Sequence, residues 1–347
     1  MRRTLAVTAA AGTALLARRA LRRRIARSPL WPLPALETPV SGHSPRRSLR
    51  VRVLARAEPA QGVVELTLGA PALPSWTPGA HVDLLLPSGL VRQYSLCGDP
   101  AAGTYTVAIR LDEAGRGGSR EAHARLTVGT ELRLRPPRNR FALVPAGSYV
   151  FVAGGIGITP VLPMLRAATA AGAAWTLLYG GRSRASMPYL ELLAAHGDRV
   201  TVVPQDEAGL PDLSPLAALR PGTLVYCCGP RPLAEAVLAA VPDPAAVRLE
   251  RFAPAGGSGA DRPFTAELRR SGRTVEVGAD ESALAAVRRE LPATPYSCGQ
   301  GFCGTCAHRV LAGGVDHRDT FLTDREREDS MLLCVSRARD GHLVLDL

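Results

Sequence analysis

Three cysteines, Cys298, Cys303 and Cys306, lie within the glycine-rich stretch YSCGQGFCGTCAHRVLAGG, residues 296–314. Their spacing is C-x4-C-x2-C, and Cys334 follows after 27 intervening residues. This spacing lets one loop wrap two irons while a distant cysteine supplies the fourth thiolate of an iron–sulfur cluster. Zinc sites usually contain two C-x2-C pairs, and only one pair here has that spacing. The remaining alternative is a disulfide pair.

The loop resembles the cluster loop of plant-type ferredoxins, down to CGTC and the hairpin and helix expected before it. The resemblance implies a [2Fe–2S] centre ligated by Cys298, Cys303, Cys306 and Cys334. The other cysteines are scattered, and the total of seven is odd. This usage is typical of metal ligation in a reducing compartment rather than of a secreted disulfide framework, so we expect a cytoplasmic protein.

The positive charge is concentrated at the N-terminus. Residues 1–50 hold eleven arginines and one acid, for +10 of the formal +11, and the chain contains no lysine. A near-neutral body with a basic arm argues against nucleic-acid binding. The apolar run at 4–17 is too short for a confident membrane span, so the arm, residues 1–46, is open between a membrane-surface segment (through 1–27), a disordered or misassigned start, and an export signal.

Beyond the basic arm, the pattern of predicted secondary structure changes twice along the chain. Residues 47–146 contain short alternating strands separated by Gly and Pro, which predict a small antiparallel β-barrel with one helix near 117–126. Residues 147–250 alternate strands and helices, which predicts a parallel α/β sheet. A glycine-rich linker, 251–262, precedes a hairpin, a short helix and the cysteine loop in 263–347. We therefore expect a multidomain chain.

A glycine-rich turn is expected in the α/β segment. FVAGGIGITPVLPML, 151–165, places Gly154, Gly155 and Gly157 between a buried strand and a helix, where the backbone can approach a diphosphate. A merely tight turn is the alternative. The turn resembles that of ferredoxin–NADP reductase-like enzymes, and YCCGP, 226–230, resembles their second hallmark. In that superfamily the position of Cys228 lies beside the nicotinamide, whereas Cys227 is expected to point into the sheet.

A third motif, RQYS at 92–95, resembles the flavin signature of the same enzymes. Arg92 suits a phosphate, Tyr94 suits packing against the flavin, and Ser95 suits a hydrogen bond to flavin N5. GRGGS, 115–119, opens the predicted helix about twenty residues later, so that its backbone and hydroxyl groups can bind the flavin phosphate.

From residue 47 onward the chain resembles the phthalate dioxygenase reductase family, which includes vanillate O-demethylase reductases. The motifs occur in the family's order, and LERFAP, 249–254, is similar to its lead into the ferredoxin. The resemblance implies an antiparallel flavin barrel (47–146), an NAD-binding α/β domain (147–250) and a β-grasp ferredoxin domain (263–347). It implies Ser95 and Cys228 at the reaction centre, and the cofactor-binding residues are Arg92, Tyr94, Ser95, Leu96, Ile109, Arg110, Gly117, Gly118, Ser119, Gly154, Gly155, Gly157, Ile158, Thr159, Pro160, Arg182, Ser183, Cys228, Gly229 and Pro230.

The resemblance also implies an enzyme that takes electrons from NADH through FMN to the cluster and on to a Rieske-type oxygenase, with the reductase itself a monomer. FMN is favoured over FAD because family members with a C-terminal ferredoxin use FMN. Arg182 and Arg184 leave NADPH open, since arginine there can bind a 2′-phosphate. A haem-thiolate monooxygenase is the alternative acceptor, and a non-catalytic electron-carrier or redox-sensing module is the alternative function.

Other polar residues suggest no further catalytic site. His123 is expected to be a surface or phosphate-adjacent residue. His308 and His317 follow the cysteine loop, but four cysteines already complete the expected ligand set. The charged run DREREDS, 324–330, is expected to be a solvated face, or a surface that helps an acceptor protein to dock.

Overall fold

The computed structural model describes residues 48–113, 115, 117–250, 252, 261–296, 298–319 and 321–347. The predictions for the basic arm, residues 1–46, and for nearly all of the linker fall outside these ranges. All described elements lie in one compact unit, Ser41–Leu347. Among the described helices, none combines the length and the apolar character needed to cross a membrane.

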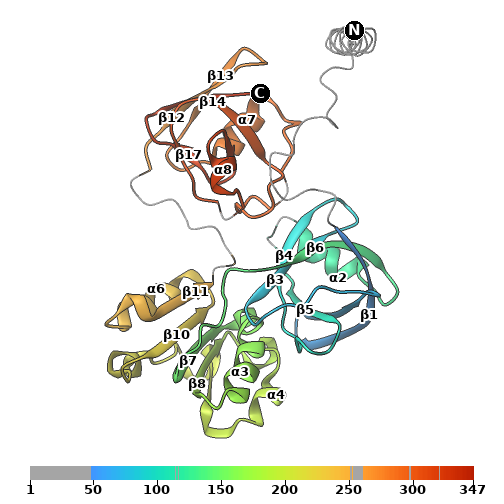
Figure 1. Cartoon of the computed structure of the whole chain (residues 1–347), viewed down its shortest axis with the longest axis vertical. Helices are drawn as coiled ribbons and strands as arrows, with labels where there is room; N and C mark the ends of the chain where they lie inside the picture. The colour runs from blue at the N-terminus through green and yellow to red at the C-terminus, as the bar shows by residue number, and fades with distance from the viewer. Residues whose placement is uncertain are drawn as a thin grey trace, which may run out of the picture. The chain divides into compact units, whose positions relative to one another are not determined.

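The N-terminal part of the described chain is a strongly curled antiparallel sheet in the order β4-β3-β6-β1-β2-β5. Alternation of apolar and charged residues explains its two faces, since Val51 and Val53 are buried while Arg52 between them is exposed. A bridge between Leu96 and Val107 joins the two edges of the sheet, which closes it. The elements are β1 (Leu49–Ala60), β2 (Val63–Gly69), β3 (Ala80–Leu85), β4 (Val91–Ser95), β5 (Tyr105–Arg110), α2 (Gly118–Arg125) and β6 (Glu131–Asn139) (Figure 1).

A parallel sheet follows, in the order β11-β10-β7-β8-β9. The strand order reverses between β7 and β10, and in such sheets ligands bind at this switch point, outside the carboxyl ends of the strands. The strands are β7 (Ser148–Gly154), β8 (Ala174–Gly181), β9 (Val200–Pro204), β10 (Thr223–Cys228) and β11 (Val247–Glu250). The helices are α3 (Val161–Ala170), α4 (Leu190–Ala194), α5 (Gln205–Ala208) and α6 (Arg231–Ala240), with 3-10 turns η1 (Gly155–Ile158), η2 (Arg184–Ser186), η3 (Gly197–Arg199), η4 (Ser214–Ala218) and η5 (Pro244–Ala246).

Helices cover both faces of this sheet. Phe151 of β7 packs with Leu165 of α3 in one apolar core. Its neighbour Val152 packs with Val237 of α6 in another. Strands β7, β8 and β10 lie between α6 and α3 in Figure 1. The nearly continuous apolar runs of β7 and β10 follow from this double burial, because helices cover both faces of the sheet.

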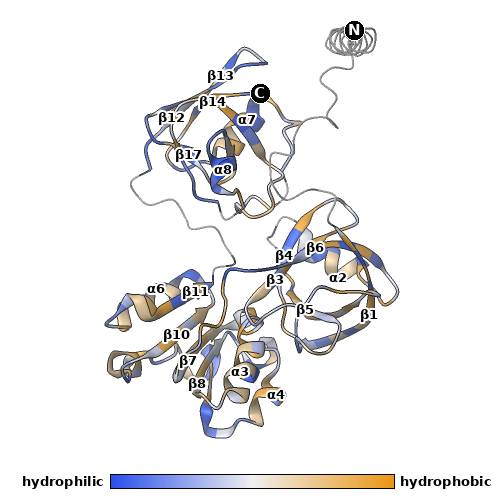
Figure 2. Cartoon of the chain, viewed as in Figure 1, coloured by the Kyte–Doolittle hydropathy of each residue, from blue (hydrophilic) through white to orange (hydrophobic). Residues whose placement is uncertain are grey.

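The C-terminal part is a mixed sheet in the order β13-β12-β18-β14-β16, in which β12 and β18 are parallel and the other pairs are antiparallel. Leu284 and Val287 of α7 bury one side of the helix in the core of this sheet. The short helix α8 is hydrophilic along its length (Figure 2). The elements are β12 (Phe264–Leu268), β13 (Arg273–Val277), α7 (Ala283–Glu290), β14 (Ala307–Ala312), β15 (Val315–Asp316), α8 (Asp324–Arg327), β16 (Ser330–Leu332), β17 (Arg337–Ala338) and β18 (His342–Leu345).

Candidate flavin, nucleotide and iron–sulfur sites

The structure brings the four cysteines of the predicted cluster site together. All four are buried free thiols, at most 8% exposed. The Cys298 thiol contacts those of Cys303 and Cys334, and Cys334 in turn contacts Cys306. Three of these cysteines lie in the loop before β14 and Cys334 follows β16, which pairs with β14. The pairing of β14 with β16 therefore delivers the distant fourth thiol.

The donor set of this loop fits an iron–sulfur cluster. The backbone N–H of Gln300 donates to the Cys298 sulfur at 3.2 Å, and that of Thr305 donates to the Cys303 sulfur at 3.5 Å. Such N–H donors stabilise the negative charge of a thiolate-bound cluster. The pKa of the Cys303 thiol is raised by its hydrogen bond with Cys298 and by burial, so thiolates here need a bound cation to stabilise them.

The cysteine loop also contacts the flavin barrel. Cys298, Phe302 and Cys303 form a small buried cluster with Val91, and Leu85 packs against it. Val91 directly precedes Arg92, the first residue of the predicted flavin motif. The chain therefore brings the predicted cluster ligands into contact with the strand that carries the predicted flavin residues.

The first half of the predicted flavin site joins β4 to the N-terminus of α2. The Arg92 side chain lies against Gly118, where any larger side chain would overlap the guanidinium group. Gly117, in the left-handed conformation, is the N-cap of α2, and no side chain among the described residues caps the first turn of this helix. A guanidinium beside helical N–H groups that no described side chain caps suits a phosphate, so these residues fit the terminal phosphate of FMN.

The second half of the motif is more buried. Burial raises the pKa of Tyr94, and the positive charge of Arg92 opposes that shift. Ser95 is 5% exposed, and Leu96 is fully buried in the barrel core. The backbone therefore places the tyrosine and serine between the phosphate end of the predicted site and the α/β sheet.

Three other predicted flavin residues differ in their surroundings. The Ser119 hydroxyl is hydrogen-bonded to the backbone N–H and carbonyl of Asp112, at 3.0 and 3.3 Å. Ile109 is buried in the barrel core and Arg110 is exposed. In the structure, Ser119 thus holds the loop before α2, and a direct phosphate contact by its hydroxyl remains a prediction.

The two nucleotide turns meet at the switch point of the parallel sheet. Gly157 lies so close to the end of β10 that a Cβ would overlap the carbonyl oxygen of Cys228. Gly154 and Gly229 also pack together, since a Cβ added to Gly154 would lie 3.2 Å from the Gly229 Cα. The Thr159 hydroxyl donates to the Ile156 carbonyl at 2.9 Å, which stabilises the turn before α3. Ile158 and Pro160 are buried beside it.

Arg182 and Ser183 follow the carboxyl end of β8, as predicted from the sequence. Ser183 is the N-cap of η2, where its hydroxyl group is hydrogen-bonded to that of Ser186. Arg184 is engaged by Glu207, whose two oxygens accept from its Nε at 3.0 and 2.9 Å. Arg182 is exposed. The structure therefore gives the two arginines different environments that the sequence did not indicate.

Glu250 is a candidate functional residue that the sequence analysis missed. Its Oε2 accepts a hydrogen bond from Ser95 at 3.3 Å and lies 3.8 Å from the Cys228 sulfur. Burial raises the pKa of Glu250 to about 7, and the hydrogen bonds from Ser95 and Cys228 oppose that shift. Glu250 ends β11 directly beside Cys228 in the sheet register. The available signal was an acid at the carboxyl end of a strand in a ligand-binding sheet.

Both predicted reaction-centre residues therefore meet at one carboxyl group. Burial and the nearby negative charge of Glu250 raise the pKa of the Cys228 thiol, which keeps it neutral. Its neighbour Cys227 faces the other way, into the apolar core beneath α6. The alternation of side chains along β10 separates these adjacent cysteines.

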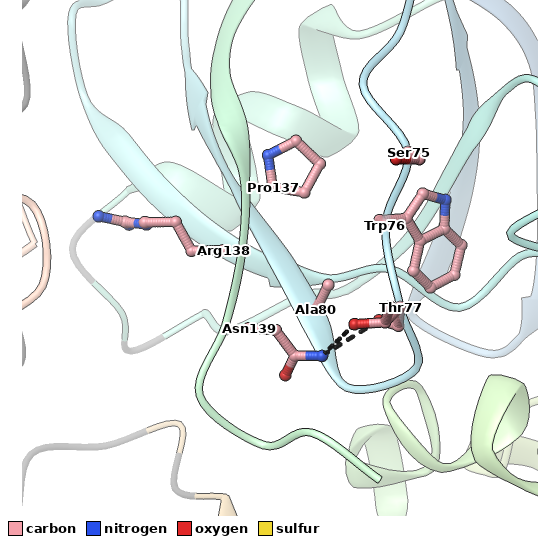
Figure 3. A pocket seen from close by; sticks show the side chains of 7 residues that line it. All are labelled: Ser75, Trp76, Thr77, Ala80, Pro137, Arg138 and Asn139. Atoms are coloured by element: carbon pink, nitrogen blue, oxygen red, sulfur yellow. Dashed lines mark hydrogen bonds between the residues drawn. The ribbon is translucent and has the colours of Figure 1, made fainter.

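A cavity of about 290 Å³ opens elsewhere on the barrel, between the loop before β3 and the strand β6 (Figure 3). The amide of Asn139 donates to the Thr77 hydroxyl at 2.8 Å across it. The Arg138 side chain points away from Trp76 and Thr77. The cavity shares no residue with the predicted flavin set; it is lined by Ser75, Trp76, Thr77, Ala80, Pro137, Arg138 and Asn139.

The three histidines considered in the sequence lie in structural positions. His123 Nε2 lies 2.8 Å from the Ile109 carbonyl oxygen, so this ring links α2 to β5. His317 Nε2 lies 3.1 Å from the Arg327 carbonyl oxygen. His308 lies on β14, and burial lowers its pKa. The run 324–330 begins with α8, whose side chains are exposed or half-buried.

Comparison with known proteins identifies two family domains. Residues 266–339 match the 2Fe-2S iron-sulfur cluster binding domain, and residues 151–239 match the oxidoreductase NAD-binding domain. The chain is 42% identical over 312 residues to the phenoxybenzoate dioxygenase subunit beta of Ectopseudomonas oleovorans, covering 86% of this chain and 97% of that protein. It is 38% identical over 312 residues to the phthalate 4,5-dioxygenase oxygenase reductase subunit of Pseudomonas putida, covering 86% and 96%.

Two solved structures are similar over most of the chain. An intact type IV self-sufficient cytochrome P450 monooxygenase is 40% identical, with a TM-score of 0.67 over 93% of this chain and 45% of that one. Phthalate dioxygenase reductase, described as a modular structure for electron transfer from pyridine nucleotides to [2Fe-2S], is 33% identical, with a TM-score of 0.64 over 86% and 98%. The predicted fold class, cofactor set and oxidoreductase class are confirmed. The chain belongs to the phthalate dioxygenase reductase family of flavin- and [2Fe–2S]-containing reductases of oxygenase systems.

Proposed function

We propose that the chain oxidises NADH and delivers the electrons singly, through a cluster held by Cys298, Cys303, Cys306 and Cys334, to a Rieske-type oxygenase. When bound, FMN supplies the conversion of a two-electron hydride donor into two one-electron transfers. The domain limits 47–146, 147–250 and 263–347 and the individual site residues are part of this proposal. A monomeric state and contact of residues 1–27 with a membrane surface remain predictions from the sequence.

The observation that carries the proposal is the meeting of Ser95, Cys228 and Glu250. Ser95 belongs to the flavin motif, and Cys228 belongs to the second nucleotide turn. The Glu250 carboxyl group contacts both, at 3.3 and 3.8 Å. A flavin ring held by β4 and a nicotinamide held at the end of β10 would therefore be brought face to face, which is the positioning that hydride transfer requires.

The chain's own residues have distinct proposed roles at this centre. Arg92 and the N-terminus of α2 bind the flavin phosphate. Ser95 donates a hydrogen bond near flavin N5, and its own contact with Glu250 fixes the hydroxyl orientation. Glu250 can hold or release a proton near neutral pH, because burial raises its pKa to about 7. Cys228 and Gly157 shape the surface on which the nicotinamide rests.

NADH is supported as the donor by the environment after β8. Arg184 is bound by Glu207 through both carboxylate oxygens, so its guanidinium group already has a negatively charged partner. A carboxylate at this point also repels a 2′-phosphate. We expect NADH to give the higher kcat/KM and Glu207→Gln to raise kcat/KM for NADPH about tenfold, leaving that for NADH nearly constant. Preference of the unmodified protein for NADPH would contradict this assignment.

The whole proposal is tested by anaerobic addition of NADH to the purified holoprotein. The expected result is bleaching of both flavin and cluster absorbance. A variant with Cys334→Ser should keep flavin bleaching and lose the cluster signal. Absence of any bleaching in the unmodified protein would leave only an electron-carrier or redox-sensing module.

A second acceptor class is supported by the similarity to a self-sufficient cytochrome P450 monooxygenase. There, a segment like this chain makes up about half of a longer protein. Separate reconstitution distinguishes the two classes. The reduced protein is mixed with oxygenases encoded beside its gene, and acceptor reduction is followed by the electron paramagnetic resonance of a Rieske centre or by the carbon monoxide complex of a haem. Reduction of the haem protein alone would overturn the Rieske assignment.

A further inference from the structure

A buried ion-pair network lies on the barrel, outside the predicted flavin residues. Asp83 of β3 has a fully buried side chain. Its two oxygens accept from Arg138 of β6 at 2.7 and 2.6 Å, and Oδ2 lies 3.3 Å from Arg135. A buried carboxylate is costly unless it is paired, so Asp83 holds both guanidinium groups in place. One acid and two bases leave this group with a net positive charge.

The network continues onto the cysteine loop. Arg135 Nη1 donates to the carbonyl oxygen of Cys303, a predicted cluster ligand, at 2.7 Å. The guanidinium groups of Arg135 and Arg138 lie over the Phe321 ring, 5.6 and 5.9 Å from its centroid. Phe321 packs directly on Gly304, the residue that follows Cys303 in the same loop. Two side chains of β6 thus hold the cysteine loop. Arg135 binds its backbone, and both Arg135 and Arg138 lie over the Phe321 ring that packs on it.

This polar contact lies beside an apolar one. Val91 and Leu85 of the barrel pack against the loop residues Cys298, Phe302 and Cys303. Leu85 and Asp83 lie on the same strand, β3. The cysteine loop therefore sits on β3, β4 and β6, and β4 carries the flavin motif. Arg135 contributes a directional, charge-assisted contact that fixes how the loop is seated.

We propose that Asp83 and Arg135 form a clamp that seats the cluster loop on the flavin barrel, with Arg135 as a positioning residue for electron transfer between the two cofactors. The inference rests on the proposed function. Each transfer removes one electron from the reduced flavin and adds one to the [2Fe–2S] cluster. Two transfers use the electron pair that one hydride from NADH supplies.

The charge of Arg135 gives the clamp a second effect. The cluster becomes more negative by one charge when it is reduced, and a cation beside a ligand carbonyl stabilises that state. Arg135 therefore raises the reduction potential of the seated cluster. By linkage, reduction of the cluster tightens its seating on the barrel to the same extent.

Arg135→Gln in the full-length holoprotein tests the clamp, with Arg133→Gln as the matched control. Arg133 lies two residues away on β6 and is exposed, so its replacement removes the same charge from the same strand. Stopped-flow mixing with NADH follows flavin bleaching and cluster reduction separately. We expect Arg135→Gln to slow cluster reduction about tenfold, the effect of losing one charge-assisted hydrogen bond, and to leave flavin bleaching unchanged.

A redox titration followed by electron paramagnetic resonance supplies a readout independent of turnover. The cluster potential should become more negative in Arg135→Gln, stay constant in Arg133→Gln, and be restored largely by Arg135→Lys, which keeps the charge. A cluster-reduction rate and a potential in Arg135→Gln equal to those of Arg133→Gln would overturn the clamp. Failure of NADH to bleach the flavin of the unmodified protein would instead overturn the proposed function.

Discussion

At the scale of single residues, Glu250 places a carboxyl group that titrates near neutral pH between Ser95 and Cys228. Burial raises its pKa from 4.5 to about 7, so the native state binds this proton more tightly than the unfolded state does. The resulting stabilisation is fully present below about pH 4.5 and is lost as the pH rises through about 7. Above that range, the ionised carboxylate of this half-buried side chain no longer contributes that stabilisation.

Glu250→Gln removes this dependence because glutamine does not titrate. Between about pH 5 and about pH 8, the free energy of unfolding of the unmodified protein should fall relative to that of the variant by roughly 2 kcal/mol. Urea denaturation at several pH values measures the difference. Parallel pH curves for the two proteins would show that the carboxyl group is not shielded from water in solution.

Gly157 is a second single residue with a testable role, because the structure leaves no space for a Cβ atom there. Gly157→Ala introduces a Cβ that would overlap the Cys228 carbonyl oxygen. The overlapping atom belongs to the backbone, so relieving the overlap requires the two turns to move apart. We expect the two nucleotide turns to separate and flavin reduction by NADH to slow by about 10- to 100-fold. Gly147→Ala is the control, since nothing lies within 4 Å of its added Cβ. Equal flavin-reduction rates in the two variants would mean that the turns are not closely packed.

At the scale of elements, the helices of the ferredoxin part depend on their first residues. Ser282 caps α7, accepting a hydrogen bond from the N–H of Ala285 at 3.2 Å. Arg288 and Arg289 lie in the last turn, where positive charge stabilises the carbonyl end. The apolar side of α7 then buries Leu284 and Val287 against the sheet.

Ser282→Ala leaves the N–H of Ala285 without its partner. The free energy of unfolding should fall by about 1 kcal/mol, whereas Ser282→Thr, which keeps an acceptor oxygen, should cost much less. Thermal unfolding followed through the cluster absorbance measures both. Equal losses for Ala and Thr would assign the effect to packing rather than to the cap.

At the scale of the whole molecule, two contacts join the barrel to the parallel sheet and to the cysteine loop. Cys228 and Glu250 of the parallel sheet meet Ser95 of the barrel. The cysteine loop contacts the same barrel strand at Val91. The electron path that we propose therefore enters at the switch point of the parallel sheet and leaves through the C-terminal loop.

Removal of one proposed cluster ligand should separate flavin reduction from cluster reduction. In Cys334→Ser, flavin bleaching by NADH should persist while cluster absorbance and reduction of a one-electron acceptor such as cytochrome c are largely lost. Cys227→Ala is the control, because that buried thiol lies under α6 and not in the cysteine loop. Retention of the cluster spectrum in Cys334→Ser would remove Cys334 from the ligand set.

The sequence predicted the elements because each carries its own local pattern. The strand β7 and the turn after it follow from an apolar run and three glycines, and the loop at 298–306 follows from cysteine spacing. Ser95 and Cys228 were predicted from short motifs, each on one strand. The environments of Arg184 and Ser119 were not predicted, because no local pattern in the sequence indicates their partners, Glu207 and Asp112.

By itself, the sequence determined the order of the segments, the cofactors that they suit and the four thiols that we propose as cluster ligands, since these depend on residue type and local spacing. Only the tertiary structure decided that Glu250 faces Ser95 and that Arg135 reaches the Cys303 carbonyl across 168 residues of chain. Long-range contacts of this kind leave no periodicity in the sequence. They depend on how strands pair and sheets pack, and these choices fix the surroundings, and thus the pKa and charge, of each buried group.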